Sequence, residues 1–246
     1  MVLTNNTILI TGGSSGLGQE MATKFLQMGN KVIVCSRSPG KLELTKNKLP
    51  KIITFQCDIS IEAEQKRLAS WIKIHHPDLT VLINNAAIVN RTDFITDNES
   101  PNKLSGEIAT NLTAPIHLIK LLYPILIKNN NAAILNITSG LIYTPRSIYP
   151  FYNATKSALH AFTQVIRHQL QHEPIKIIEV MFPAVDTPWH KGHAPKSSIS
   201  AQKAISEMIK GIEHNKSEIK VGAVKLLYYL SRITPKFAFK KINALQ

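Results

Sequence analysis

The sequence predicts an α/β fold built on a doubly wound sheet of seven parallel strands, with helices on both faces. Short apolar runs and longer amphipathic runs alternate along all 246 residues. Repeated strand–helix–strand units form parallel sheets with right-handed crossovers. Several short runs are almost wholly apolar, as expected of strands that helices cover on both faces. The first run is followed at once by a glycine-rich turn, where nucleotide-binding sheets of this class place one.

Each element is predicted from the spacing of its apolar residues. The runs predicted as strands are Thr7–Thr11, Lys31–Cys35, Ile52–Cys57, Thr80–Asn84, Ala132–Thr138, Ile175–Met181 and Ile219–Val221. The runs predicted as helices are Leu17–Met28, Lys41–Leu49, Glu62–His75, Pro101–Asn129 and Tyr152–His172. No repeat, low-complexity tract or linker divides the chain, so residues 1–246 are predicted to form a single domain with a basic C-terminal tail at about 222–246.

Polar residues follow the predicted strands at their carboxyl ends, the edge at which such sheets bind ligands. Because parallel strands bring their carboxyl ends to one edge, we expect these residues to form one site. In chain order they are Thr11–Gly18, Ser36-Arg37, Asp58, Asn84-Asn85, Ser139 and Pro183–Thr187.

The turn after the first strand reads Thr11-Gly-Gly-Ser-Ser-Gly-Leu-Gly18. Gly12, Gly16 and Gly18 permit a tight turn and a close approach to a pyrophosphate, and the following helix presents unpaired N–H groups. A structural turn that binds nothing is the alternative. The position of the loop between a strand and a helix favours a dinucleotide site of the Rossmann type.

The end of the second strand bears on the choice between the two nicotinamide cofactors. An acidic residue there would bond the ribose hydroxyls and repel a 2′-phosphate. The sequence instead reads Val34-Cys-Ser-Arg-Ser38, and Arg37 can pair bidentately with a phosphate. We therefore predict a preference for NADP(H) over NAD(H). The alternative for Arg37 is a solvated surface arginine.

A hydroxyl, a phenol and an ammonium recur at a spacing that suits proton transfer. Tyr152 and Lys156 share one face of a helix, and Ser139 stands thirteen positions before Tyr152. Lys156 would bring the pKa of the phenol nearer to neutral pH, and Ser139 would orient a substrate oxygen. Tyr152 alone would be interpreted as a buried helix tyrosine. Beside a glycine loop, the trio predicts hydride transfer between a nicotinamide and a carbonyl carbon.

These motifs resemble those of the short-chain dehydrogenase/reductase family, in its single-domain members of about this length. The family's TGxxxGxG corresponds to Thr11–Gly18, its NNAG to Asn84–Ala87 and its YxxxK to Tyr152–Lys156. The resemblance extends from Thr7 to roughly Thr187. It implies a domain that both binds the dinucleotide and performs the chemistry.

The resemblance also implies roles for individual residues. Tyr152 would be the general acid/base and Ser139 would orient the substrate. Lys156 would lower the pKa of the tyrosine and bind ribose, while Asn111 would hold a water in a proton relay with it. Asp58 and Asn85 match positions on the adenine side. The expected cofactor contacts are Gly12, Ser14, Ser15, Gly16, Leu17, Gly18, Arg37, Asp58, Asn85, Ala86, Tyr152, Lys156, Pro183, Val185 and Thr187.

Two positions depart from the family's pattern. Ala87 replaces the glycine after the paired asparagines, and Ala184 replaces the glycine of the usual Pro-Gly turn. Neither change removes a chemical group, so activity is expected. Within the family, Cys57-Asp-Ile-Ser60, Trp71-Ile72 and Lys220-Val-Gly222 resemble bacterial members named after the D-alanylation of lipoteichoic acid. That likeness implies no particular substrate.

Apolar residues flank the proposed chemistry in sequence. If they line the cleft, the substrate is largely apolar; core packing is the equally open alternative. The polar segment from Asp186 to Ile199 is interpreted as a lid. His190 and His193 lie in it without a third ligand, so no metal site is predicted. The flanking residues are Leu141, Ile142, Tyr143, Tyr149, Phe151 and Trp189.

Lys and Arg number 29 against 16 Asp and Glu, a formal net charge of +13 that favours anionic partners. The tail shares this excess and is either a solvated basic surface or a helix lying on a membrane. A signal segment and an apolar run of about 20 residues are both missing, so a cytoplasmic location is expected. Cys35 and Cys57 lack CxxC spacing and are predicted to be buried core thiols.

Together these features predict an NADP(H)-dependent oxidoreductase that interconverts a carbonyl and an alcohol on a small to medium, largely apolar substrate. The alternatives are an NADP(H)-binding sensor or scaffold without turnover, and a peripheral protein of anionic membranes. No nucleic-acid-binding motif appears, so binding to such polymers would be nonspecific. By resemblance to the family, pairing through Pro101–Asn129 and Tyr152–His172 would give a homodimer or homotetramer.

Overall fold

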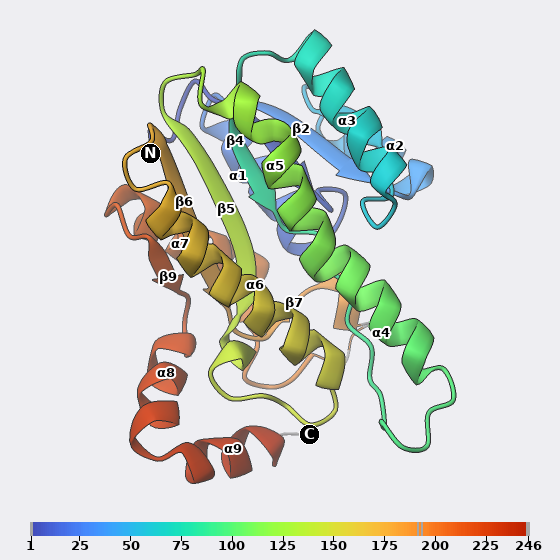
Figure 1. The fold of residues 1–246 in the computed structure, drawn as a ribbon, viewed down its shortest axis with the longest axis vertical. Coiled ribbons are helices and arrows are strands. Elements are labelled where there is room, and N and C mark those ends of the chain that lie inside the picture. The colour runs from blue at the N-terminus through green and yellow to red at the C-terminus, as the bar shows by residue number, and fades with distance from the viewer. Residues whose placement is uncertain (1, 191, 193, 245–246) are drawn as a thin grey trace.

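A computed structural model describes residues 2–190, 192 and 194–244 of the chain. Seven parallel strands form its main sheet in the order β3-β2-β1-β4-β5-β6-β9, and the order reverses between β1 and β4 (Figure 1). This confirms the predicted doubly wound sheet and places its ligand-binding edge. The strands are β1 (Thr7–Thr11), β2 (Lys31–Ser36), β3 (Ile53–Gln56), β4 (Leu79–Asn84), β5 (Ala132–Ser139), β6 (Ile175–Phe182) and β9 (Glu218–Lys220).

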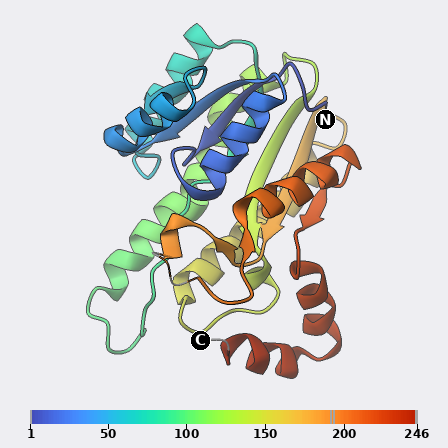
Figure 2. The same cartoon turned by 180° about the vertical axis from the view of Figure 1, so that it is seen from behind.

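Helices cover both faces of the sheet, because successive strand residues point to opposite sides. Ile8 and Ile10 of β1 pack into a core with α1 and α7, whereas Leu9 joins a core with α3, α5 and α6. Figure 1 shows the second group in front of the sheet, and Figure 2 shows α1 and α7 from behind. The helices are α1 (Gly16–Gln27), α2 (Pro39–Lys48), α3 (Glu62–His75), α4 (Ser100–Ile108), α5 (Ala114–Leu126), α6 (Pro150–Gln169), α7 (Ala201–Glu213), α8 (Val224–Ile233) and α9 (Pro235–Asn243).

The long helix predicted for Pro101–Asn129 is interrupted. A π-helical turn at Ala109–Thr113 separates α4 from α5. Pro115 has no N–H and cannot donate to the carbonyl of Asn111 four residues earlier, so the regular α-helical ladder is broken here. The side chain of Asn111, on this wider turn, is fully buried. A π-turn of this kind often marks a functional site.

Three helices near the C-terminus, α7, α8 and α9, are not among the helices predicted from the sequence. α7 follows Ser200, whose hydroxyl caps the helix by accepting from the N–H of Lys203 at 3.2 Å. α8 and α9 occupy most of the segment predicted as a tail, and they lie at the end of the molecule where the strands have their carboxyl ends (Figure 1). The described part of the tail is therefore folded onto the domain.

The structure also describes the two cysteines. Cys35 and Cys57 are buried free thiols, as predicted. Among the residues that the structure describes, no helix combines the length and the hydrophobicity required to cross a bilayer.

The close packing of α1 on the glycine loop predicts a stability effect. A Cβ at Gly18 would lie 2.3 Å from the carbonyl oxygen of Gly12, and the backbone there cannot move aside. We predict that Gly18→Ala lowers the free energy of unfolding by about 1–3 kcal/mol. Gly40→Ala is the matched control, because a Cβ at Gly40 meets nothing within 4 Å. Urea denaturation measures both variants, and equal stabilities would contradict the packing described.

Candidate active site

The glycine loop forms a cradle at the carboxyl end of β1. Gly12 has a φ of +65°, and a Cβ there would lie 2.9 Å from Cα of Ala86. α1 begins at Gly16, with Ser15 at its N-cap and no acidic residue in its first turn. The unpaired N–H groups of that turn favour an anion. The loop therefore fits the pyrophosphate of a dinucleotide. Ser14 beside it is buried.

Asn85 and Ala86 brace this loop from the end of β4. Nδ2 of Asn85 donates to the carbonyl oxygen of Thr11 at 2.9 Å. The backbone N–H groups of Asn85 and Ala86 both donate to Oγ1 of Thr11 at 3.0 Å. These bonds join the two strands between which the strand order reverses. The Asn-Asn-Ala segment thus holds the shape of the crevice in which such sheets bind nucleotides.

The residues expected on the adenine side follow β2 and β3. Arg37 directly follows β2 and is exposed, and the sequence from Lys31 to Ser38 contains no carboxylate. Oδ1 of Asp58 accepts from the N–H and the hydroxyl of Ser60, at 3.0 and 2.7 Å. Asp58 therefore shapes the turn that leads into α3. The end of β2 therefore carries the cationic side chain of Arg37, and β2 itself contains no Asp or Glu.

The predicted proton-transfer trio meets at the carboxyl end of β5. Ser139 ends this strand, while Tyr152 and Lys156 lie one turn apart on α6. Nζ of Lys156 lies 5.8 Å from the centre of the Tyr152 ring and donates to the carbonyl oxygen of Ile137 at 2.8 Å. The Ser139 hydroxyl lies near enough to the Tyr152 phenol to lower its pKa, and both side chains line one cavity. The structure thus brings together three groups that are separated in sequence.

Desolvation determines the protonation of this pair. Burial raises the pKa of the Tyr152 phenol to about 12, and the hydrogen bond with Ser139 acts in the opposite direction. Burial also lowers the pKa of the Lys156 ammonium to about 8. The sequence led us to expect that Lys156 brings the phenol's pKa down toward neutral. In this structure burial is the larger effect, so Tyr152 is a protonated acid at neutral pH.

A buried carboxylate lies behind Lys156. Glu179 of β6 is fully buried, and its carboxylate accepts from Oγ1 of Thr138 at 2.6 Å and bonds to Nδ1 of His160 at 2.8 Å. His160 is one turn beyond Lys156 on α6. A buried charge is costly unless it is bonded, so these contacts anchor Glu179. Its negative charge favours the ammonium form of Lys156. The sequence feature that could have pointed to this role is the single acidic residue, Glu179, within the mostly apolar strand β6.

Asn111 holds the loop that follows β4. Its Oδ1 accepts from the N–H of Ile88 at 2.9 Å, and its Nδ2 donates to the carbonyl oxygen of Ile88 at 2.8 Å. Nδ2 also donates to Oγ1 of Thr155 on α6 at 3.3 Å. The amide of Asn111 therefore links the π-helical turn, the loop after β4 and the helix of Lys156.

The proton-transfer trio and one edge of the glycine loop open into a cavity of about 430 Å³ at the carboxyl edge of the sheet. Asn111 and the more distant adenine-side residues are not among its lining residues. The nicotinamide and substrate ends of the predicted site therefore share one chamber. The predicted residues that line it are Leu17, Asn85, Ser139, Tyr152, Lys156, Pro183, Val185 and Thr187.

Much of the cavity wall is apolar. Leu141, Tyr149 and Trp189 line it, which agrees for these three residues with the interpretation that the flanking apolar residues line the cleft. Ile142, Tyr143 and Phe151 do not; the Tyr143 hydroxyl is bonded to Sδ of Met181 at 3.0 Å. α8 and α9 also contribute to the wall, which the sequence does not predict. These helices lie far along the chain from the site motifs, and no motif in them indicates a contact with the cavity. The lining residues from these helices are Val224, Leu226, Leu227, Leu230 and Ile242.

The segment interpreted as a lid is anchored at both ends. β7 (Val185–Asp186) pairs with β8 (Ile199–Ser200), and Trp189 and His190 between them line the cavity. His193 lies outside the described residues. Within residues 2–190, 192 and 194–244, no group of three His, Cys, Asp or Glu side chains is gathered as metal ligands would be.

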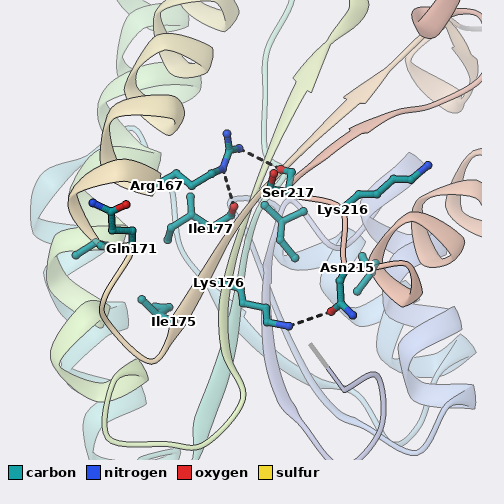
Figure 3. A pocket seen from close by; sticks show the side chains of 11 residues that line it. Arg167, Gln171, Ile175, Lys176, Ile177, Asn215, Lys216 and Ser217 are labelled. Atoms are coloured by element: carbon teal, nitrogen blue, oxygen red, sulfur yellow. Dashed lines mark hydrogen bonds between the residues drawn. The ribbon is translucent and has the colours of Figure 1, made fainter.

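A second hollow, of about 250 Å³, lies at the amino ends of β6 and β9 (Figure 3). Several of its polar groups are hydrogen-bonded to one another. Arg167 donates to the carbonyl oxygens of Ile177 and Ser217, both at 3.0 Å, and Lys176 donates to Oδ1 of Asn215 at 3.0 Å. None of the predicted site residues lines it. The cavity at the carboxyl edge is therefore the candidate active site.

Known proteins share both the sequence pattern and the fold. The family model for short chain dehydrogenases matches residues 6–197. The chain is 39% identical over 248 residues to the uncharacterized oxidoreductase DltE of Bacillus subtilis (strain 168), covering 99% of this chain and 98% of that protein. The chain belongs to the short-chain dehydrogenase/reductase family of oxidoreductases.

Solved structures of this family superpose on nearly the whole chain. A short chain dehydrogenase from Burkholderia cenocepacia J2315, in complex with NADP, has a TM-score of 0.87 at 22% identity, with 98% of this chain and 99% of that one covered. One from Burkholderia phymatum, in complex with NAD, has a TM-score of 0.84 at 19% identity, with 100% and 99% covered. At these identities the likeness establishes the fold.

Glu179 predicts a change in pH dependence. If Lys156 acts as an ammonium, kcat/KM for carbonyl reduction falls as the pH rises through its pKa of about 8. Glu179→Gln removes a charge that favours the protonated amine, so we predict that this alkaline limb moves to lower pH. A pH–rate profile measures the shift. Glu213→Gln, at an exposed carboxylate on α7, is the control. An unmoved limb in Glu179→Gln would remove Glu179 from this role.

Proposed function

We propose that the protein is an NADP(H)-dependent oxidoreductase that interconverts a carbonyl and an alcohol on a small to medium, largely apolar substrate. The observation that supports this most directly is the meeting of Ser139, Tyr152 and Lys156 in one cavity beside the glycine loop. A screen of ketones and alcohols that follows NADPH absorbance tests the proposal. A chain that binds NADPH but turns over no carbonyl or alcohol would instead be a sensor or scaffold.

The proposed chemistry assigns one task to each polar group. A bound nicotinamide nucleotide supplies or accepts the hydride. Tyr152, protonated because burial raises its pKa, donates its proton to the substrate oxygen as negative charge develops there. Ser139 holds that oxygen beside the phenol. The Lys156 ammonium stabilises the phenolate that remains and holds the ribose, and Asn111 supports a water relay that returns the proton.

The proposed preference for NADP(H) depends on the end of β2. Arg37 is exposed at the position where a 2′-phosphate is expected, and no carboxylate on that strand would repel it. Asp58 at the end of β3 has one oxygen bonded within its own turn. The local charge is therefore suited to a phosphorylated ribose.

The proposed substrate class follows from the cavity wall. Leu141, Trp189 and the residues of α8 and α9 present apolar surface close to the polar trio. Such a wall favours an apolar body with one polar reacting group. We further infer a cytoplasmic homodimer or homotetramer that pairs through α4–α5 and α6. Val165 on α6 supports that pairing, because this apolar side chain is exposed.

Removing the phenolic hydroxyl should separate binding from chemistry. We predict that Tyr152→Phe abolishes turnover yet retains NADPH binding, because the ring remains and only the proton donor is lost. Fluorescence titration with NADPH and an absorbance assay measure the two properties. Tyr229→Phe, at an exposed tyrosine on α8, is the control. Preserved turnover in Tyr152→Phe would exclude Tyr152 as the acid.

Removing the cation after β2 should affect one cofactor only. A hydrogen bond to a charged group contributes about 1.5–3 kcal/mol, so we predict that Arg37→Ala weakens NADPH binding by roughly 10- to 100-fold. NADH lacks the 2′-phosphate, and its binding should stay nearly unchanged. Titration with both nucleotides, alongside Lys51→Ala as an exposed control, measures the effect. A parallel loss for both nucleotides would contradict the assignment.

A further inference from the structure

α8 and α9 present an outer surface on which apolar and basic side chains alternate. We call it the tail face. Its apolar members are between 48% and 76% exposed: Leu226, Tyr229, Ile233, Phe237 and Phe239. Its basic members are also exposed: Lys225, Arg232, Lys236, Lys240 and Lys241. No Asp or Glu occurs anywhere in residues 222–246. A basic helical surface with large exposed apolar side chains is unusual for a solvated tail.

The apolar side chains of α8 form a stripe. Leu226, Tyr229 and Ile233 are spaced by three and four residues, so they share one side of α8. Phe237 and Phe239 are exposed on α9, which begins after the bend at Thr234 where α8 ends. Five large apolar side chains are thus exposed on two consecutive short helices, and such a concentration of exposed apolar surface marks an interaction site.

The tail face is held in place by its contacts with the domain. Val224 at the start of α8 is buried against Gly140, where a Cβ would lie 2.9 Å from its Cγ2. At the other end, Oδ1 of Asn243 accepts from the N–H of Ser147 at 2.6 Å, and its Nδ2 donates to the carbonyl oxygen of Pro145 at 3.1 Å. Docking therefore requires no prior folding of this surface, which lowers its entropic cost.

The tail face adjoins the mouth of the active-site cavity. Leu226 and Trp189 both line the cavity and remain about half exposed or more, so they stand where it meets solvent. Leu227 and Leu230 of the same helix line its interior. The loop between β4 and α4, which exposes Phe94 and Ile95, reaches the same end of the molecule (Figure 1). The apolar rim of the cavity and the tail face thus lie at one end.

The charges of this face distinguish between partners. A second copy of the chain would bring the five cations of one tail face against the same five of another, and stable protein interfaces are depleted of such charges in their centres. Duplex nucleic acid would pair with the cations but would leave the Phe, Ile and Leu side chains in water. An anionic bilayer meets both requirements, since its headgroups attract Lys and Arg while its acyl boundary takes up the apolar side chains.

We propose that the tail face docks the protein on an anionic lipid bilayer, with the mouth of the active-site cavity close to the membrane surface. Apolar carbonyl compounds that partition into the bilayer would then reach the cavity without crossing bulk water. The docking itself does not depend on turnover, so it can be tested whether or not the proposed oxidoreductase activity is found.

The test uses the full-length chain and vesicles of phosphatidylcholine, with or without phosphatidylglycerol. Sedimentation should show binding to the mixed vesicles, weakened by added salt, and little binding to phosphatidylcholine alone. The triple variant K236E/K240E/K241E should weaken binding at least about tenfold, because each cation near an anionic surface contributes to attraction. The matched control is K51E/K73E/K128E, which makes the same charge change at exposed lysines near the amino ends of β3, β4 and β5.

A second variant, F237S/F239S, tests the apolar contribution and should remove the binding that persists at high salt. Thermal unfolding and NADPH titration of every variant establish that the domain is intact. Three results would overturn the proposal. One is equal loss in the two triple variants, and another is equal binding to neutral vesicles. The third is a chain that binds neither kind of vesicle, and tail variants that then change its oligomeric mass or its affinity for duplex DNA would assign the tail face to one of those partners.

Discussion

The position of Lys156 is the constraint on which the candidate site depends. Its ammonium is buried one helical turn from Tyr152 and is held by the carbonyl oxygen of Ile137 at 2.8 Å. A buried cation is stable only when its surroundings bond it and carry opposite charge. Here β5 supplies the carbonyl and β6 supplies the carboxylate of Glu179. The sheet therefore positions the helix to which we assign the chemistry.

The same burial explains why the acid and the cation have different properties. Desolvation disfavours charge on both groups, so it raises the pKa of the Tyr152 phenol and lowers that of the Lys156 ammonium. Near neutral pH the phenol holds its proton and the lysine holds its charge. The proton donor and the phenolate stabiliser that we propose would thus be available together.

The two ends of the chain contribute different parts of the site. The N-terminal strands and the glycine loop form a polar crevice whose backbone is braced by Thr11 and Asn85. α8 and α9 at the other end close the cavity with aliphatic side chains. Because their inner side lines the cavity and their outer side is the tail face, a membrane contact and substrate access would be coupled through the same two short helices.

Local patterns in the sequence were sufficient to predict the sheet, the glycine loop and the Tyr152–Lys156 pair. Each depends on residues that are close together in the chain, because a short stretch of sequence is enough to indicate a strand, a turn or two residues on one side of a helix. The tertiary structure alone decided that Glu179 lies behind Lys156, that Asn111 is engaged with Ile88, and that α8 and α9 wall the cavity. It also decided the direction of the Tyr152 pKa shift. These properties arise from contacts across long sequence separations and from burial, which no spacing in the sequence specifies.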